Sequence, residues 1–320
     1  MSIDTFAVDG GDTAFGALRA YGENPSAFLA MCEGKEYFTV AGRHGVIPYR
    51  DTGGHLHQSA GVIAPDGGQE PLLRAFTEFA GERRRKVVAT RLRRPEAELF
   101  SRCGFTVNQA GSSYSVYLPE FRLGGPRLAG LRLAVSRAWL AGLEAAEGTY
   151  EDRAAGPGRD GAGADDVADV ADVADGRRVF VGRLGGEVVA SITYLPVFGT
   201  RPGWLHHTAH RAPGMPGGAL EAVNLEAVRV FTAEEAQWLH LGFTPFAGLG
   251  AQYELGSASV AAARLLRLAA ARGEWRRAAA ARLAYQRIWD PHLVQPGYLA
   301  WRGRAAAGAL GRLLKLAKSP

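Results

Sequence analysis

Two successive stretches of the chain show the same order of expected strands and helices, and this repetition constrains the fold more than any other feature. In the first, alternating residues and turn signals predict a β-meander over about residues 36–61, then a helix, a strand, a helix and a strand. In the second, a helix at about 126–147 precedes a hairpin that turns at Gly185 and Gly186, a strand, a long helix and another strand. The order predicts a pseudo-duplicated α/β (α+β) protein with mixed β-sheets flanked by helices.

The expected boundaries divide the 320 residues into two halves and a tail. The first half covers residues 1–125 and the second covers 126–302, while 303–320 form a basic amphipathic tail. Within the second half, residues 151–176 are dominated by Gly, Ala and Asp and repeat a Val-Ala-Asp triplet. A period of three fits neither a helix nor a strand, so we expect a disordered acidic insertion there.

Composition excludes several classes of protein. With 47% apolar and 22% charged residues, the chain has an ordinary globular balance and is not wholly disordered. No apolar run approaches the roughly 18–20 residues that span a bilayer, and the acidic N-terminus lacks a secretory signal pattern. Cys32 and Cys103 are too few for a disulfide framework or a cysteine zinc site. We therefore expect a cytoplasmic protein without an integral membrane segment.

The net charge of +5 is unevenly distributed. Residues 151–175 hold eight acids against two arginines, a local charge of −6, which leaves +11 on the rest of the chain. Nearly all of that positive charge is arginine, whose planar fork suits bidentate phosphate contact. A genome rich in G and C also enriches arginine and alanine, so both explanations stay open.

The order and spacing of six segments carry a resemblance to a known family. The segments are EYFTVAGRHGVIPYR, SYSVYLPEFRLGG with LRLAVSRAWLAGL after it, RVFVGRLGGEVVASITYLPVF, PGGALE at 216–221, LHLGFTPFAG, and WDPHLVQPGYLAWRG. Over roughly residues 20–302 they resemble the C-terminal domain of bacterial phosphatidylglycerol lysyltransferases. The resemblance implies two tandem GNAT-like domains and an aminoacyltransferase that takes an amino acid from aminoacyl-tRNA. It also implies a small-molecule or lipid acceptor and no cofactor, since the aminoacyl ester is already activated. Without a transmembrane flippase, the chain more closely resembles stand-alone members, some of which act in natural-product biosynthesis.

The resemblance also implies the position of the catalytic residues. Family members often carry Asp-x-x-Arg shortly before a Pro-Asn-Gly turn, and here His207 and His210 occupy those positions, followed by Arg211. We expect a histidine to act as general base or to position the acceptor, and Arg211 to bind phosphate or a carboxylate. The alternative is a pair of half-exposed histidines at a strand end. A metal site is not expected, because adjacent strand residues point to opposite faces and no zinc motif accompanies them.

The substrate-binding residues are expected at two turns and one helix. Backbone amides after Pro216 and Gly217 would favour an anion at a helix N-terminus, and Glu221 would bind an α-amino group. By resemblance, Gly242 and Pro245 shape a loop that approaches the substrate closely. The alternative for Pro216 and Gly217 is an ordinary strand-to-helix turn, and the alternative for Glu221 is a first-turn acid favoured by the helix dipole.

Arginines provide the remaining candidates. The resemblance places Arg287 where family members have lysines, as a contact for the tRNA terminus or an oxyanion. Two basic runs are candidate tRNA-binding surfaces, and they contain Arg83, Arg84, Arg85, Arg276 and Arg277. The tail, with five cations and no acids between Arg302 and Lys318, is a candidate for peripheral membrane contact or for packing on its own domain.

Two other functions compete with aminoacyl transfer. An acyl-CoA-dependent GNAT N-acyltransferase would need a loop whose amides cradle pyrophosphate, and the loop from Arg211 to Pro216 nearly fits. Pro216 has no amide hydrogen to donate, which argues against this function. A non-catalytic RNA-binding relative would explain the missing Asp-x-x-Arg motif, because a fold does not determine its function.

Overall fold

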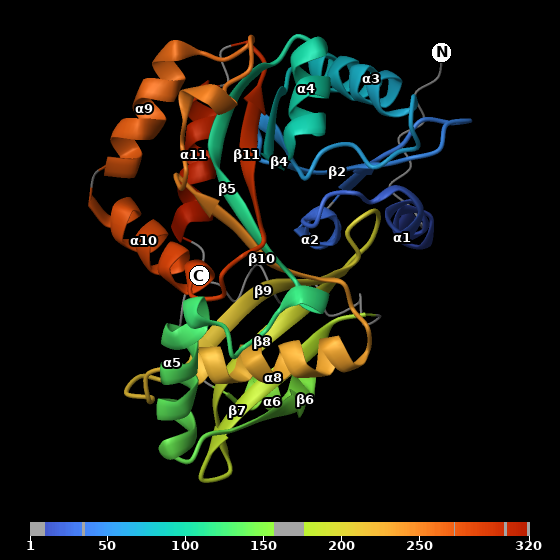
Figure 1. Ribbon diagram of the computed structural model, residues 1–320. Coiled ribbons are helices and arrows are strands. Elements are labelled where there is room, and N and C mark those ends of the chain that lie inside the picture. The colour runs from blue at the N-terminus through green and yellow to red at the C-terminus, as the bar shows by residue number, and fades with distance from the viewer. Residues whose placement is uncertain (1–9, 34–35, 157–175, 272, 304–305, 319–320) are drawn as a thin grey trace.

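The computed structural model describes residues 10–33, 36–156, 176–271, 273–303 and 306–318. Its strands form a single eleven-stranded mixed sheet in the order β1-β2-β3-β4-β11-β5-β10-β9-β8-β7-β6 (Figure 1). The strands are β1 Glu36–Phe38, β2 Ile47–Asp51, β3 His55–Ser59, β4 Lys86–Leu92, β5 Thr106–Tyr117, β6 Glu144–Gly148, β7 Arg178–Leu184, β8 Glu187–Val197, β9 Gly203–Arg211, β10 Trp238–Pro245 and β11 Leu293–Trp301. This sheet confirms the predicted mixed α/β architecture.

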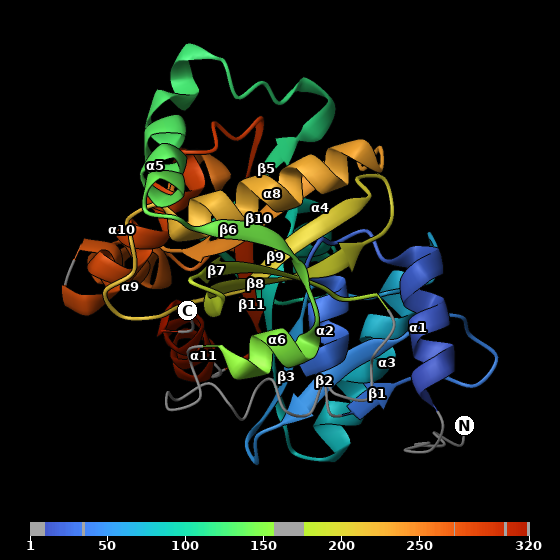
Figure 2. The same cartoon turned by 90° about the horizontal axis from the view of Figure 1, so that it is seen from below.

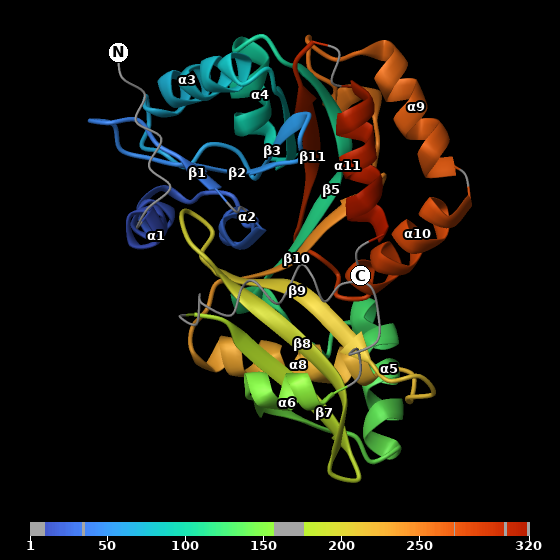
Figure 3. The same cartoon turned by 180° about the vertical axis from the view of Figure 1, so that it is seen from behind.

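Helices cover both faces of the sheet, as the views from below and behind show (Figures 2 and 3). In the second half α8 and α5 lie on one face and the short α6 on the other (Figure 3). In the first half α3 and α4 pack on one face, while α2 and α11 cover the other. The helices are α1 Gly10–Tyr21, α2 Ala27–Glu33, α3 Gln69–Glu82, α4 Arg94–Arg102, α5 Ala129–Leu140, α6 Tyr150–Ala155, α8 Ala219–Ala233, α9 Val260–Ala271, α10 Gly273–Arg287 and α11 Ala306–Lys318, with 3-10 turns at Leu118–Glu120, Pro126–Leu128 and Ala251–Tyr253.

Local sequence explains why the first-half helices form where they do. In α3 the apolar residues Leu72, Leu73, Phe76 and Phe79 recur at helical spacing, and all four are buried against the sheet. In α4 Glu96 accepts a hydrogen bond from the backbone amide of Arg93, which satisfies a donor that the first turn leaves unpaired. These packing and capping contacts confirm the predicted helix–strand–helix–strand order.

The last strand connects the two halves of the sequence. β11 pairs antiparallel with both β4 and β5 and so lies inside the sheet of the first half. β5 in turn pairs with β10 of the second half. The expected boundary between residues 125 and 126 therefore does not separate the strands, because residues 293–301 complete the first half of the sheet.

Two of the expected elements differ from the structure. The helix expected over 126–147 ends at Leu140, and residues Glu144–Gly148 form β6 instead. Gly142, with φ of 87°, ends the helix, and pairing with β7 makes the next residues extended. The start of the expected acidic insertion is helical: Thr149 caps α6 by accepting from the amide of Asp152. Residues 157–175 of that insertion lie outside the described residues.

The basic tail forms helix α11, which packs on the sheet (Figure 3). Ala309 and Leu313 are buried beside Val88 and Trp301. At least part of the apolar side of this helix is therefore occupied by the protein's own core. Among the described residues, no helix combines the length and the apolar character needed to cross a membrane.

Candidate active site

The two parallel strands β9 and β10 pair at one end and then diverge. Their register covers only Trp238 with Gly203, Leu239 with Trp204 and His240 with Leu205. Beyond this point β10 shifts register against β5 between His240 and Gly242, and Gly242 adopts φ of 87°. The divergence opens the middle of the sheet where the two halves of the chain meet.

Helix α10 satisfies the backbone that the divergence exposes. The side-chain amide of Gln286, only 1% exposed, donates to the carbonyls of Leu241 (3.0 Å) and Gly242 (3.1 Å). Thr244 donates to the Gln286 side-chain oxygen at 2.6 Å. Because buried carbonyls without partners are costly, this side chain maintains the gap between the strands.

A pocket lies at this junction, and we call it the junction pocket. It is formed by the three residues that precede α2, by the end of β4 with Arg93 after it, and by residues of β5, β9, β10 and β11. Its lining residues are Asn24, Pro25, Ser26, Arg91, Leu92, Arg93, Ser113, Tyr114, Ser115, Leu205, His240, Gly242, Phe243, Gln295, Pro296 and Gly297. The predicted residue Gly242 is among them.

A hydrogen-bonded serine–histidine pair lines the junction pocket. His240 Nε2 lies 3.0 Å from the carbonyl oxygen of Arg201, and His240 Nδ1 lies 2.9 Å from Ser115 Oγ. A carbonyl oxygen can only accept, so Nε2 carries the proton and Nδ1 accepts from the Ser115 hydroxyl. Burial lowers the pKa of His240 to about 4, which keeps the ring neutral near pH 7. Ser115 is thus a hydroxyl bonded to a base, His240, and the Arg201 carbonyl orients that base. Such an arrangement can take a proton from the hydroxyl and so activate it.

Two arginines bring positive charge to the opening. Arg91 lines the junction pocket from β4 and holds a positive φ of 55°, which is costly for a residue other than glycine. Asn24 donates to its carbonyl at 2.9 Å and so ties the start of α2 to this point. Burial is the main cause that lowers the pKa of Arg282 on α10. Repulsion by the nearby charge of Arg91 lowers the pKa of Arg282 further. A guanidinium stays charged even so, and Arg282 lies near Arg91 without lining the junction pocket itself.

A second polar cluster lies on the opposite face of the sheet. The Tyr285 hydroxyl lies 3.3 Å from His206 Nε2, and the Tyr194 hydroxyl donates to Asn224 Oδ1 at 2.5 Å. Burial lowers the pKa of His206 to about 4, and the charges of His207 and Arg282 act in the same direction. Burial, followed by the charge of Glu221, raises the pKa of Tyr285, so Glu221 lies near this hydroxyl. Burial also raises the pKa of Tyr194, so His206, Tyr194 and Tyr285 are neutral near pH 7.

The predicted catalytic residues lie further along β9. His207 occupies a bulge, since His206 pairs with Tyr194 and Thr208 with Thr193. His210 is half-buried opposite Ser191, and its Nε2 atom is buried without a hydrogen-bond partner. Burial lowers the pKa of His210, with a smaller effect from Arg153, and Arg211 is exposed at the strand end. None of the three is among the residues that line the junction pocket.

The turn before α8 is packed closely against α5. Gly218 has φ of 94°, and a Cβ atom there would lie 1.9 Å from the carbonyl oxygen of Ala134. Gly217 is exposed and has open space around its Cα, whereas Pro216 is half-buried. Of the three residues predicted here, Glu221 is the one that the structure brings to the cluster around Tyr285.

The other predicted substrate contacts take different positions. Pro245 is buried at the end of β10, where it shapes the strand that carries His240 and Gly242. Arg287 is exposed at the end of α10, and its charge opposes the rise that burial gives the pKa of Tyr114. Arg287 therefore lies near the wall of the junction pocket rather than among its lining residues.

The predicted tRNA-binding arginines lie in two separate places. Arg83, Arg84 and Arg85 occupy the turn between α3 and β4, at the far end of β4 from Arg91. Arg83 stacks on Phe79 at 3.7 Å, and Arg85 forms an ion pair with Asp51 at 3.0 Å. Arg277 is exposed on α10, and the side chain of Arg276 lies outside the described residues.

The residue pairs that sequence reasoning missed come from distant strands. Ser115 and His240 are separated by 125 positions, and no motif marks either one. Arg282 of α10, which lies close enough to Arg91 for their charges to interact, was likewise not singled out from the sequence. Among the described residues, no cluster of three or more His, Cys, Asp or Glu side chains could hold a metal ion.

Comparison with known proteins places the chain in a family. The family "Phosphatidylglycerol lysyltransferase, C-terminal" matches residues 15–156 and 166–301. The comparison with curated proteins found no match.

Three solved structures share the fold. The C-terminal domain of a putative lysylphosphatidylglycerol synthetase from Agrobacterium fabrum is 18% identical, with a TM-score of 0.71 and 96% of each chain covered. L-PGS from Bacillus licheniformis is 17% identical, with a TM-score of 0.71 and 98% of each chain covered. FemX is 8% identical, with a TM-score of 0.55, and the match covers 94% of this chain and 96% of FemX. The chain thus belongs to the phosphatidylglycerol lysyltransferase C-terminal family and has its tandem GNAT-like fold.

Proposed function

We propose that this protein transfers an aminoacyl group from aminoacyl-tRNA to a small-molecule or lipid acceptor, in specialised metabolism, and that the junction pocket is the reaction site. The family supports the reaction class. The observation that carries the assignment of the site is the hydrogen-bonded chain from Ser115 through His240 to the Arg201 carbonyl in that pocket. A reaction of this type needs no cofactor, because the aminoacyl ester already has a good leaving group.

The proposed chemistry uses the Ser115–His240 pair to handle one proton. An acceptor hydroxyl or amine attacks the ester carbonyl, and its proton passes to Ser115 Oγ while the Ser115 proton passes to His240 Nδ1. The C–O bond to the terminal ribose of the tRNA then breaks, and the ribose oxygen takes up that proton. The pKa of His240, about 4 in the free pocket, would rise as negative charge develops on the attacked ester.

The two arginines at the opening would stabilise negative charge during the reaction. Arg91 lines the junction pocket, and the burial of Arg282 strengthens its interaction with an anion. In this proposal they bind either the developing oxyanion or the terminal phosphate of the tRNA. Glu221 lies beside Tyr285 on the opposite face of the sheet, so this proposal gives it no contact with an aminoacyl ester in the junction pocket.

The residues of β9 have proposed roles along the path to the pocket. His210 shares the face of the sheet that carries Leu205, a lining residue of the junction pocket. In this proposal His207, His210 and Arg211 position the acceptor, and His240 accepts the proton. Gly242 and Pro245 shape β10, Pro216 and Gly217 form the turn before α8, and Arg287 adds positive charge nearby.

The acyl-CoA alternative has less support from the geometry. Pro216 lacks an amide hydrogen, and Gly218 abuts the Ala134 carbonyl of α5. Backbone amides at this turn therefore have less room for a pyrophosphate than an open helix N-terminus would offer.

Donor identity provides the direct test of this function. The protein would be incubated with a mixed pool of tRNAs charged with labelled amino acids, together with an extract of its source as acceptor. We expect a labelled product that requires the protein and disappears after ribonuclease treatment. Product formation from acetyl-CoA that is insensitive to ribonuclease would contradict the proposal.

A further inference from the structure

Exposed apolar side chains gather on two helices, α5 and α9. Nine large apolar side chains are exposed among the described residues, and six of them lie on these two helices. Single exposed apolar residues are ordinary on a protein surface, but a concentration of them marks an interaction site. The six are Leu133, Trp139 and Leu140 on α5 and Val260, Leu265 and Leu268 on α9.

Helix α10 connects these two helices into one continuous side of the molecule. It packs against α9, and Ile288, just after its C-terminal end, lies beside the start of α5. A Cβ atom at Gly130 of α5 would come 3.7 Å from the Ile288 side chain. In all three views α5, α10 and α9 follow one another along the same side of the molecule (Figures 1, 2 and 3). A broad partner can therefore contact α5 and α9 at once.

The charge on this side is positive. Neither α5 nor α9 contains an acidic residue, whereas each contains two arginines. Exposed arginines share helical faces with the apolar residues, since Arg137 follows Leu133 by four positions and Arg264 precedes Leu268 by four. We use the name α5–α9 surface for the six apolar residues together with the exposed Arg137, Arg264 and Arg267.

Three kinds of partner match this pattern to different degrees. A nucleic-acid backbone matches the arginines but gains little from exposed leucines and valines. A second copy of the same surface matches the apolar residues but brings arginines against arginines. An anionic lipid bilayer matches both, because leucine and tryptophan side chains enter the interface while arginine heads stay among the lipid phosphates.

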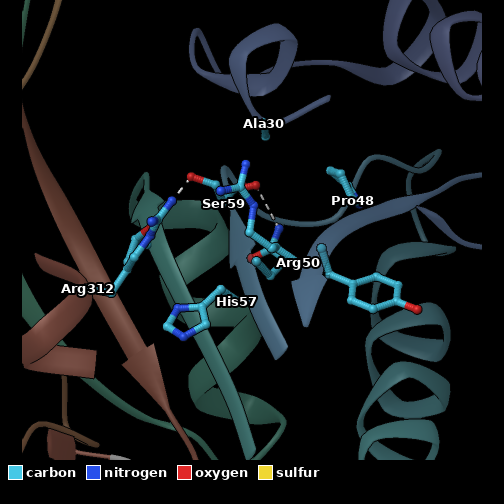
Figure 4. A pocket seen from close by; sticks show the side chains of 9 residues that line it. Ala30, Pro48, Arg50, His57, Ser59 and Arg312 are labelled. Atoms are coloured by element: carbon cyan, nitrogen blue, oxygen red, sulfur yellow. Dashed lines mark hydrogen bonds between the residues drawn. The ribbon is translucent and has the colours of Figure 1, made fainter. Parts of the chain in front are cut away.

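The basic helix α11 is turned more toward the protein than its composition suggests. Leu313 is buried against the sheet beside Trp301. Arg312 lines a pocket next to β3 and reaches inward toward Ser59, as Figure 4 shows. Side chains that point inward are not available to a bilayer, so the contact is better placed on α5 and α9 than on this tail.

We propose that the α5–α9 surface docks this protein on an anionic lipid bilayer. Trp139, Leu140, Leu265 and Leu268 enter the interface, and the arginines beside them contact the lipid headgroups. None of these residues lines the junction pocket, so the docking is separate from any acceptor bound there and does not rest on the proposed function.

Flotation of the full chain with lipid vesicles tests the docking. The vesicles contain phosphatidylserine and phosphatidylcholine in equal parts, and vesicles of phosphatidylcholine alone are the neutral comparison. We expect the wild type to float with the anionic vesicles at low salt. Two double variants, Trp139→Gln with Leu140→Gln and Leu265→Gln with Leu268→Gln, should each weaken the affinity about tenfold or more. Tyr150→Gln, which replaces an exposed aromatic residue on α6 over the other face of the sheet, should leave it unchanged.

Two further measurements separate the cationic contribution from the apolar one. Arg264→Gln with Arg267→Gln should weaken binding at low salt and reduce its dependence on salt, whereas Arg43→Gln, an exposed arginine of the first half, should change neither. Lipids with brominated chains should quench the tryptophan fluorescence of the wild type. The Trp139→Phe variant should lose most of that quenching, because Trp139 is the tryptophan placed in the interface.

Either of two results would overturn the proposal. Equal vesicle affinity of the wild type and both apolar double variants, all folded by circular dichroism, would show that the exposed apolar residues take no part in binding. No flotation of the wild type at low salt would leave an acidic protein or a nucleic acid as the partner of this surface. The test does not require transfer activity, so its failure is distinct from that of the proposed function.

Discussion

His240 is the residue whose protonation most directly connects stability with the proposed chemistry. Burial lowers its pKa from 6.5 to about 4 in the folded protein, and His206 is shifted in the same way. Between about pH 4 and pH 6.5, His240 therefore binds a proton in the unfolded chain but not in the folded chain. The free energy of unfolding should therefore be unaffected by His240 above pH 6.5 and should fall as the pH drops toward 4, by about 3 kcal/mol at most for one histidine.

Urea unfolding at pH values from 7.5 down to 5 measures this effect. The His240→Asn variant cannot titrate at this position, so its stability should decline less steeply with falling pH than that of the wild type. The other acid-sensitive groups are common to both proteins and cancel in the comparison. An identical decline in both would show that His240 is not held neutral by burial.

At the residue scale, sequence reasoning identified Gly242 but not the pair beside it. Gly242 was recognisable because it occupies the same position as a glycine in the loop of the family that the sequence resembles. Ser115 and His240 meet only because β5 and β10 pair antiparallel, and no local pattern records that pairing. Likewise, the orientation of α10 decides which of its arginines comes close to Arg91, and Arg282 is one that does.

The turn before α8 allows a matched comparison at the scale of a single element. Gly218→Ala would place a methyl group against the Ala134 carbonyl at a backbone angle that favours glycine. We expect the free energy of unfolding to fall by more than about 1 kcal/mol because strain and overpacking add. The neighbouring Gly217→Ala has open space and should leave stability nearly unchanged.

Thermal or chemical unfolding of both variants measures the difference. A Gly218→Ala protein as stable as the wild type would mean that α5 moves away from α8 at little cost. Transfer activity of the Gly217→Ala protein then reports separately on the predicted role of this turn in substrate binding.

Several elements were predictable because their signals are local. The apolar spacing of α3 and the Gly185–Gly186 hairpin both appear as expected. The helix expected over 126–147 was too long, because pairing with β7 overrides helix propensity at Glu144–Gly148. The placement of β11 between β4 and β5 depends on contacts across about 200 residues, and local periodicity carries no information about them.

At the scale of the whole molecule, the proposed function and the charge imbalance together predict how tRNA affinity depends on salt. The −6 charge of residues 151–175 opposes the +11 of the remaining chain. Replacing residues 158–174 by an uncharged Gly-Ser segment of equal length should strengthen tRNA binding at low salt, because long-range repulsion is removed. The gain should disappear at high salt.

Filter binding of labelled tRNA over a series of salt concentrations gives both the affinity and its dependence on salt. A deletion of the same residues serves as the control, since it also shortens the chain between α6 and β7. Unchanged affinity and salt slope in both variants would indicate that the acidic segment acts on neither the tRNA nor its binding surface.

The central claim is that aminoacyl transfer takes place in the junction pocket through Ser115 and His240. The most direct measurement is the single-turnover rate at which labelled amino acid leaves charged tRNA for the acceptor, with tRNA affinity measured in parallel. We predict that His240→Asn lowers this rate about 100-fold or more while tRNA affinity stays within about twofold, as loss of a general base requires. Ser113→Ala, a change in the same pocket, should remain near the wild-type rate. Transfer by His240→Asn at the wild-type rate would contradict the claim, and a loss confined to His210→Ala would move the proton transfer to β9.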